Sequence, residues 1–442
     1  MRLIQLILGS ALLVFIAFLL IAPLFNVANY LRDSNLTQPD VPTFAVDTHR
    51  SISNDFAQWA RTRVQSRAAE NLTIQNISGT EWPMFSAVYY LWATEELERL
   101  SHRTNTDLPS DYASEAIEAA ADLVAHPSTA KWVRDHWGET YLEKENLFYR
   151  MLLIAGLTSY QSITSDTRYE TLLRNQVMSL SLELSSSPHG LLEDYPNECY
   201  PIDILPAIAV IKRAGALLGI DSTDFVARSL RGFTDSKLDP QTALPAYRVN
   251  AKSGEAEGPA RGVGISYMLI WAPELWPETA RQWYQRYSHH FWEQNLFWVG
   301  VREFSQDTPV FYSWLGDVDS GPIIVGKGVA ASAFGLAAAR INGKPQQAYA
   351  LSAQAILASW PLLSGRLMLP RLLSDLTDAP YLGETALLFI LTRPKSNTAE
   401  ETVNLRMPLV VPVVMGSLCL LILLLLKVSF RLLRNGWNSQ LA

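Results

Sequence analysis

The chain has 442 residues, a formal net charge of −7 and a hydrophobic content of 48%. This length suits one large domain or two to three smaller ones. A modest negative charge without any basic run excludes a protein that follows a nucleic-acid backbone, so we expect no nucleic acid among its partners. Two strongly apolar segments, one near each end, account for part of the hydrophobic content.

The first apolar segment, residues 3–25, is interrupted only by Gln5, Gly9, Ser10 and Pro23. At about 1.5 Å per residue, a helix of this length crosses the roughly 30 Å hydrocarbon core of a bilayer. A cleaved signal peptide is the alternative, but such a peptide ends in a small-x-small site, and the sequence around Pro23 offers no good one. The sequence therefore predicts an uncleaved membrane anchor.

The second apolar segment, residues 409–426, is followed directly by Lys427, Arg431 and Arg434. Positively charged flanks stay in the cytoplasm. This predicts that both termini are cytoplasmic. The body of the chain is predicted on the other side of the cell (inner) membrane, in the periplasm or another extracytoplasmic space. The predicted organisation is an N-terminal transmembrane anchor (1–28), a linker (29–54), an extracytoplasmic domain (55–400), a C-terminal transmembrane helix (407–428) and a cytoplasmic basic tail (429–442).

Between the two spans, apolar residues recur at helical spacing. Ser165 and Asp166 precede one periodic run and Gly219 follows another, as helix caps do. Twelve helices are predicted, at residues 55–70, 84–100, 110–125, 143–162, 167–184, 203–218, 222–232, 262–271, 277–292, 324–341, 345–359 and 382–391. Several connections are short, so consecutive helices should form antiparallel hairpins. Six such hairpins predict an all-α (α/α)6 toroid flanked by one transmembrane helix at each end.

This organisation resembles the six-hairpin glycosidases and the terpenoid-cyclase-like toroids, which implies a site at one mouth of the ring, on loops that lead into inner helices. Three motifs are similar to the middle of linalool dehydratase-isomerase-like proteins: Glu145-Asn146-Leu147-Phe148-Tyr149-Arg150, Ser165-Asp166-Thr167-Arg168-Tyr169 and Tyr195-Pro196-Asn197-Glu198-Cys199-Tyr200. The resemblance implies chemistry by cysteine and acid residues around a buried terpenoid, with Cys199 and Glu198 in those roles. Tyr149, in the first motif, is expected to contact substrate.

The densest group of chemically active side chains lies in residues 189–207, where Glu193, Asp194, Glu198 and Asp203 stand among tyrosines and prolines. Hydrolysis of a glycosidic bond needs one protonated and one ionised carboxyl group, and such a loop can hold carboxyl groups in different environments. We predict Glu198 or Asp203 as the general acid, and Glu193 and Asp194 as solvated. Asp203 also fits the N-cap of the next helix. The substrate contacts expected from this loop are Tyr195 and Tyr200.

A second acidic loop holds Asp317 and Asp319 between glycines, just before the predicted helix 324–341. One of the two is predicted to be the base that partners the general acid. Turn and capping chemistry and a metal ion are the alternatives. The chain lacks the spacing of an EF-hand or of a histidine zinc site, so we predict no metal and no cofactor. Trp314, beside this loop, is expected to bind substrate.

Arg261 precedes Gly262 and Gly264 at a predicted helix start. Gly-x-Gly at such a position can hold an anion, but a tight helix–helix contact is its more ordinary use. Arg261 is predicted to hold a substrate oxyanion or to orient a carboxylate. Arg302 and Glu303 suggest a structural ion pair, and Glu303 also joins the expected substrate contacts. Residues 81–83, Glu-Trp-Pro, are predicted to lie in a loop.

Three functions fit these features. The first is a membrane-anchored enzyme that uses carboxylate acid–base chemistry on a glycan. The second is a linalool dehydratase-isomerase-like lyase or isomerase that acts on a terpenoid or lipid alcohol through Cys199. The third is a non-catalytic binding or scaffold module of a membrane glycan system, with membrane proteins as partners. The enzyme hypotheses require Glu198, Asp203, Asp317 and Asp319 to meet in one concave pocket.

Overall fold

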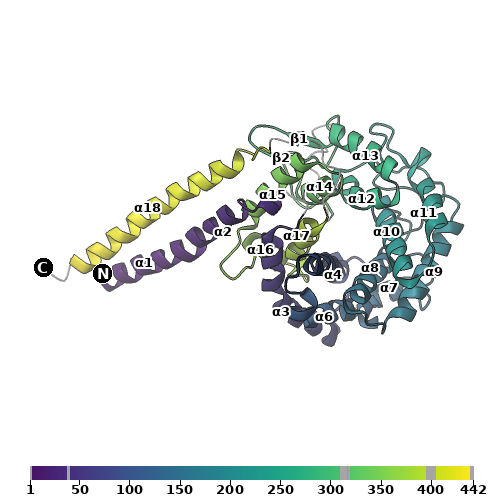
Figure 1. The fold of residues 1–442 in the computed structure, drawn as a ribbon, viewed down its shortest axis with the longest axis horizontal. Coiled ribbons are helices and arrows are strands. Elements are labelled where there is room, and N and C mark those ends of the chain that lie inside the picture. Colours follow the sequence, from purple (N-terminus) through teal and green to yellow (C-terminus); the bar gives the residue numbers. More distant parts are fainter. Residues whose placement is uncertain (1, 37–39, 309–315, 317–318, 395–404, 439–442) are drawn as a thin grey trace.

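A computed structural model describes residues 2–36, 40–308, 316, 319–394 and 405–438. Most of the described chain is helical. Figure 1 shows a ring of helices with a long helical hairpin that leaves its side, and both ends of the chain lie at the tip of this hairpin.

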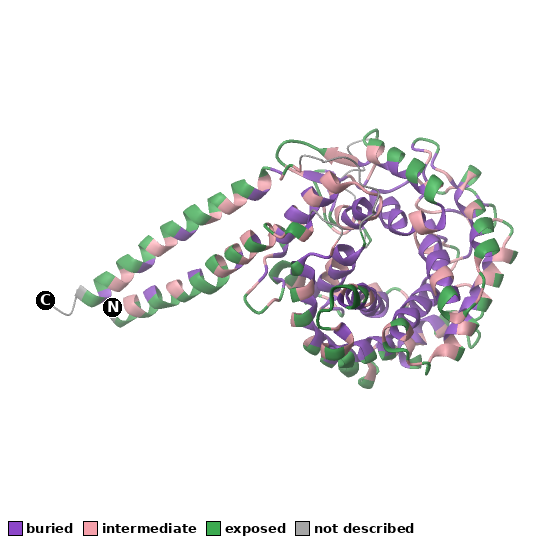
Figure 2. Cartoon of the chain, in the orientation of Figure 1, coloured by how far each residue is buried: buried purple, intermediate pink, exposed green. Residues whose placement is uncertain are grey.

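Within the described residues, six helices form a closed circuit in which each contacts the next and the last contacts the first. They are α4 (Ile77–Thr104), α8 (Leu147–Thr164), α10 (Pro201–Leu218), α12 (Gly262–Leu275), α14 (Val329–Ile341) and α17 (Leu382–Thr392). They are mostly buried, as Figure 2 shows. Helices that are apolar on nearly all sides belong in a core.

An outer helix precedes each of these inner helices along the chain. The outer helices are α3 (Thr43–Gln65), α6 (Ser114–Ala125), α9 (Glu170–Ser186), α11 (Thr223–Ser229), α13 (Pro277–His290) and α15 (Pro345–Ser359). Their outward faces are exposed in Figure 2. Each of the twelve predicted helices therefore has a counterpart in the structure.

Shorter elements connect the main helices. The short helices are α5 (Pro109–Tyr112), α7 (Lys131–Trp137) and α16 (Met368–Ser374). Two small antiparallel sheets pair β1 (Trp292–Gln294) with β2 (Val299–Val301), and β3 (Ile323–Ile324) with β4 (Lys327–Gly328). The second sheet replaces the predicted beginning of helix 324–341. Gly326 adopts φ +79° in its turn, a conformation that suits glycine, so α14 begins only at Val329.

Two further predictions were wrong. The segment 29–54 is not only a linker, because α3 begins at Thr43. Phe44, Thr48 and Ile52 are buried on one face of α3, so this stretch had a helical period hidden among polar residues. The segment 81–83 is not a loop but part of α4.

Prolines inside the inner helices are tolerated because other groups use the carbonyls that proline leaves free. Pro83 has no N–H for the carbonyl of Gly79, which instead accepts a hydrogen bond from Arg63. Pro273 similarly frees the carbonyl of Leu269, which accepts a bond from Asn342 Nδ2 at 2.9 Å. Tertiary contacts thus keep α4 and α12 continuous.

The projecting hairpin consists of the two chain ends. Helix α1 (Arg2–Phe15) continues through a π-helical turn (Ile16–Ile21) into α2 (Ala22–Tyr30), and α18 (Val410–Asn438) packs against α1. Both arms are long and apolar enough to cross a membrane. They approach closely at Gly9, whose carbonyl accepts a bond from Ser429 Oγ at 2.7 Å. Small residues allow such close contacts between helices in a bilayer.

Candidate functional site

A cavity of about 950 Å³ lies at the N-terminal ends of the six inner helices. Each inner helix contributes lining side chains from its first half: Glu81 and Phe85 (α4), Phe148 (α8), Asp203 (α10), Val263 and Tyr267 (α12), Ala330 and Phe334 (α14), and Leu382 and Ala386 (α17). The six helices therefore direct their N-termini to the same mouth. Free N–H groups at helix N-termini carry partial positive charge, so this mouth favours carboxylates.

Four acids from three distant parts of the chain line this cavity: Glu81, Glu198, Asp203 and Asp319. The two predicted acidic loops therefore meet, as far as Asp319 represents the second one. Asp317 and Trp314 lie outside the described residues. Tyr195 and Tyr200 also line the cavity, in the position predicted for substrate contacts. No group of three potential metal ligands occurs in the described part of the chain.

Asp203 is the third residue of α10. The N-cap position belongs to Tyr200, and no side chain caps this helix, so the predicted N-cap role of Asp203 was wrong. Burial raises the pKa of Asp203 well above its ordinary value, and the negative charge of Asp319 raises it further. The described residues give its carboxyl group no hydrogen-bond partner. These features favour the protonated acid.

Glu81 lies in the same cavity and is only 6% exposed. Burial raises its pKa to about 8. A hydrogen bond with Tyr195 lowers this pKa, and the charges of Asp319 and Asp203 raise it. Sequence analysis missed Glu81 because it stands at the start of a mostly apolar run. The available signal was a single acid in such a run, because buried acids without a charged partner are rare and occur mainly at functional sites.

Tyrosine hydroxyl groups hold the other two acids. Tyr200 donates to Glu198 Oε2 at 2.8 Å, and Tyr247 donates to Asp319 Oδ2 at 2.5 Å. The rings of Tyr200 and Tyr247 meet edge to face at 5.5 Å. Each donor fixes one carboxylate oxygen at the cavity wall, whereas burial is the main influence on the pKa of Glu81 and of Asp203.

Arg261 and Glu303 lie behind this wall. They form a buried ion pair at 2.8 Å, and the Arg261 guanidinium lies 4.4 Å from the centre of the Tyr247 ring. Neither residue lines the cavity, so Arg261 orients a carboxylate and supports Tyr247 without facing a ligand. The expected pair of Arg302 with Glu303 was wrong, because Arg302 pairs with Glu293 at 2.9 Å.

The glycines after Arg261 serve close packing, but their nearest neighbours lie in segments outside the helices and not, as the more ordinary alternative predicted, in another helix. A Cβ atom at Gly262 would lie 1.9 Å from the carbonyl oxygen of Arg302, and one at Gly264 would lie 3.1 Å from the Tyr247 ring. The absence of side chains at these two positions lets α12 approach both the strand region and the cavity wall.

Two predicted residues lie away from the cavity. Cys199 is 1% exposed, and its backbone pairs with that of Val249. Burial raises the pKa of its thiol well above the ordinary value, and Asp194 and Asp203 raise it further. Tyr149 is buried, with its ring centre 6.2 Å from that of Trp132. Neither residue lines the cavity.

Asp194 also differs from its predicted solvated state. It is buried, and its Oδ2 accepts a hydrogen bond from the backbone N–H of Tyr200 at 2.6 Å. Burial raises the pKa of Asp194, with the charge of Asp203 as the next cause. Its observed contact fixes the turn that carries Tyr200 and Glu198 to the cavity.

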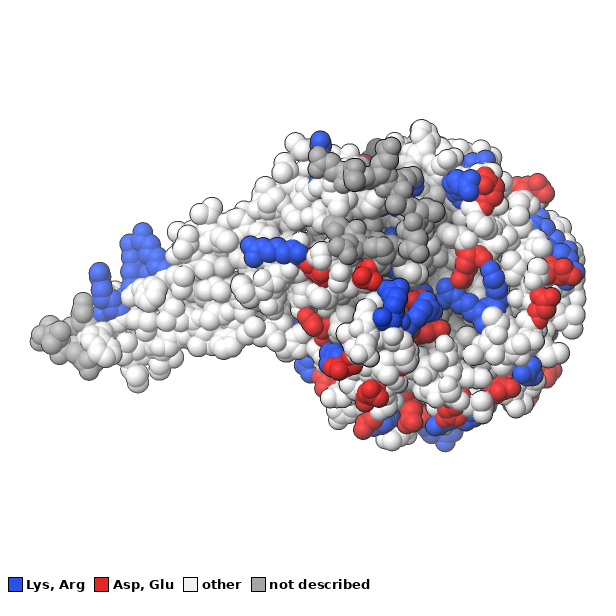
Figure 3. Space-filling model, viewed as in Figure 1, with Lys and Arg blue, Asp and Glu red and all other residues white. Residues whose placement is uncertain are grey.

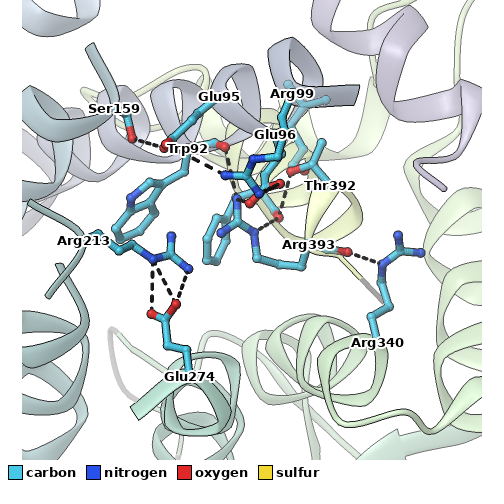
Figure 4. A network of polar contacts seen from close by, with 12 residues as sticks. Trp92, Glu95, Glu96, Arg99, Ser159, Arg213, Glu274, Arg340, Thr392 and Arg393 are labelled. Atoms are coloured by element: carbon cyan, nitrogen blue, oxygen red, sulfur yellow. Dashed lines mark hydrogen bonds and ion pairs between the residues drawn. The ribbon is translucent and has the colours of Figure 1, made fainter. Parts of the chain in front are cut away.

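A network of charged residues occupies the opposite mouth, at the C-terminal ends of the inner helices (Figure 4). Arg213 pairs with Glu274 at 2.9 Å, Arg340 Nε donates to the carbonyl of Arg393 at 2.9 Å, and Arg393 donates to the carbonyl of Trp92 at 3.0 Å. Cations at helix C-termini complement the helix dipoles. The ring thus carries cavity acids at one end and, at the other, arginines that bond to acids or to backbone carbonyls.

No known family model matches this chain, and no curated protein matches it either. The cavity is therefore the basis for a functional assignment.

Proposed function

We propose that the protein is a membrane-anchored extracytoplasmic enzyme that uses carboxylate acid–base chemistry on a glycan. The observation that carries this proposal is the convergence of Glu81, Glu198, Asp203 and Asp319 in one cavity. Burial favours the protonated form of two of them. Pairs of carboxyl groups in contrasting environments are what glycosidic bond cleavage requires.

We also propose that the fold is an (α/α)6 toroid. Its support is the closed circuit of inner helices, each preceded by an outer helix. The membrane orientation is supported by charge: Figure 3 has Lys and Arg side chains on the end of the hairpin farthest from the ring. That end is cytoplasmic by the positive-inside rule, so the ring lies outside the cytoplasm.

In the proposed reaction, Asp203 donates its proton to the leaving glycosidic oxygen. Asp319, held by Tyr247, serves as the carboxylate that activates water or attacks the sugar. Glu198 and Tyr200 hold sugar hydroxyl groups, and Glu81 supplies a second protonated group on the same wall. Phe85, Phe148 and Phe334 offer ring faces on which sugars stack.

The test uses the full chain in nanodiscs and a panel of membrane-associated glycans, with release of reducing ends as the signal. Asp203→Asn and Asp319→Asn should each lower turnover by about 10²–10⁴-fold, the usual contribution of a general acid or base. Asp221→Asn, at an exposed turn, is the matched control and should keep full activity. Full turnover in both cavity variants would refute the acid–base mechanism.

Two other outcomes separate the remaining hypotheses. Cys199→Ala should leave glycan turnover unchanged, because the buried thiol does not line the cavity. Turnover of an isoprenoid alcohol that requires Cys199 would instead identify a lyase or isomerase. Saturable glycan binding without turnover in the wild-type protein would identify a binding module.

A further inference from the structure

The segment 363–376, around α16, exposes an unusual concentration of apolar side chains. The exposed residues are Leu363, Met368, Leu369, Leu372, Leu373 and Leu376. The segment holds two cations. Arg371 turns away from this surface, since it lies 3.7 Å from the centre of the Tyr381 ring and pairs with Glu384 at 3.3 Å, and the half-exposed Arg366 pairs with Asp55. Six exposed apolar side chains within fourteen residues indicate an interaction site.

Residues 360–361, directly before the segment, are attached to the N-terminal arm of the projecting hairpin. Trp360 Nε1 donates to the carbonyl of Leu19 at 3.0 Å, and Asn26 Nδ2 donates to the carbonyl of Pro361 at 3.2 Å. Leu19 belongs to the apolar run that is long enough to cross a bilayer. The segment therefore begins at the depth of the bilayer, and Trp360 has the amphipathic ring typical of membrane interfaces.

A second exposed apolar turn is attached to the other arm. The backbone N–H groups of Leu409 and Val410 donate to the carbonyls of Leu296 and Phe297, at 3.2 and 2.7 Å. The Leu296 and Phe297 side chains are exposed. The apolar part of α18 starts at this point, so the turn lies where that helix leaves the membrane. The segment 363–376 and the Leu296–Phe297 turn are thus two exposed apolar regions at the base of the hairpin.

The same segment reaches the acidic cavity. Leu373 and Ser374 line it, as does Thr377 just after the segment. Leu373 is also 55% exposed, so it lies at the rim. Helix α16 packs against α17, which carries the lining residues Leu382 and Gly383. One continuous segment therefore joins the hairpin, the apolar surface and the cavity.

We propose that residues 363–376 and the Leu296–Phe297 turn sit in the leaflet that faces the ring, and that α16 is the rim over which ligands enter from the bilayer. The ligand is then an amphiphile: its polar head enters the acidic cavity and its apolar chain stays in the membrane beside Leu369 and Leu372. This inference names the substrate class of the proposed enzyme and rests on that function for the reaction of the head group.

Membrane contact is tested with an environment-sensitive fluorophore on the full chain in nanodiscs. Leu376→Cys, in a Cys419→Ser background, places the probe on the apolar segment, where Leu376 is 83% exposed. Leu182→Cys is the matched control, because Leu182 is 68% exposed on α9, across the ring from the hairpin (Figure 1). Nitroxide-labelled lipids should quench most of the emission at position 376 and leave position 182 unchanged. Equal quenching at both positions would overturn the placement.

Ligand entry is tested with two photoreactive probes: a dodecyl glucoside with a diazirine in its alkyl chain, and a methyl glucoside with the same diazirine. The dodecyl probe should form adducts on residues 369–383, and the double variant Leu369→Ser/Leu372→Ser should lose most of them. Equal labelling by both probes, or no adducts in this segment, would overturn the proposal. These readouts do not depend on turnover: adducts that persist while Asp203→Asn retains full activity would leave the entry route intact and refute the proposed reaction.

Discussion

Replacing Glu81 with glutamine should stabilise the protein, and this stabilisation should grow with pH. Burial raises the pKa of Glu81 from its ordinary 4.5 to about 8. Between these values the folded protein keeps a proton that the unfolded chain releases, so its free energy of unfolding falls as pH rises. Each pH unit corresponds to about 1.4 kcal/mol. From about pH 5.5 to about pH 7.5, Glu81 should therefore lower stability by a further ~3 kcal/mol, a loss that neutral glutamine avoids.

The assay is the thermal midpoint of the full chain in nanodiscs, followed by tryptophan fluorescence across this pH range. The gap between Glu81→Gln and wild type should widen by several degrees toward high pH. Asp221→Asn is the control, because a bond from the Thr223 N–H lowers the pKa of exposed Asp221. Asp221 is ionised in both states throughout this range, so its gap should stay constant. A constant gap for Glu81→Gln would mean that its carboxyl group ionises normally, and the reasoning about a protonated cavity acid would fail.

Two further predictions concern packing at the hairpin and at the opposite mouth. Gly9→Val should lower stability by about 1–3 kcal/mol, since a Cβ atom there would lie 2.8 Å from Leu433. A Cβ atom at Gly416 would meet nothing within 4 Å, so Gly416→Val should leave the thermal midpoint in nanodiscs unchanged. Arg393→Met should lower the free energy of unfolding by about 3–5 kcal/mol, because it removes a buried cation from its partners. Arg99→Met changes a side chain that is 62% exposed and should lower it by at most about 1 kcal/mol in chemical denaturation.

The helices were predictable because local apolar spacing and caps determine them. The start of α3 was not, since its polar residues mask the buried face: His49 is buried in α3 and bonded to Thr94 at 2.9 Å and Tyr112 at 2.8 Å. Local sequence carries no information about such distant partners. The same limit explains the wrong partner for Glu303, because Arg302 is its neighbour in sequence while Arg261 is its neighbour in space.

The acidic loops of the candidate site were predictable from the sequence, but the acid that α4 contributes was not. Glu198 and Asp203 stand out in a dense acidic loop, and their meeting with Asp319 was stated as the condition for an enzyme. Glu81 comes from another helix, because α4 and α10 both pack against α8 and direct their N-termini to the same mouth. Cys199 illustrates the converse: it sits next to Glu198 in sequence, but successive residues of an extended segment point to opposite sides, and its thiol faces the core.

The two ends of the inner ring provide the strongest argument that the cavity acids serve a reaction rather than the fold. At the C-terminal mouth, Arg213 is paired with Glu274 and Arg393 reaches Glu96 at 3.8 Å. At the N-terminal mouth, no cation pairs with Glu81 or Asp203 among the described residues. Buried acids without cations lower stability, and helix N-termini offset only part of this cost. Residues that stabilise a fold are normally paired, so acids without a cation in an accessible cavity are what the proposed use of their protons requires.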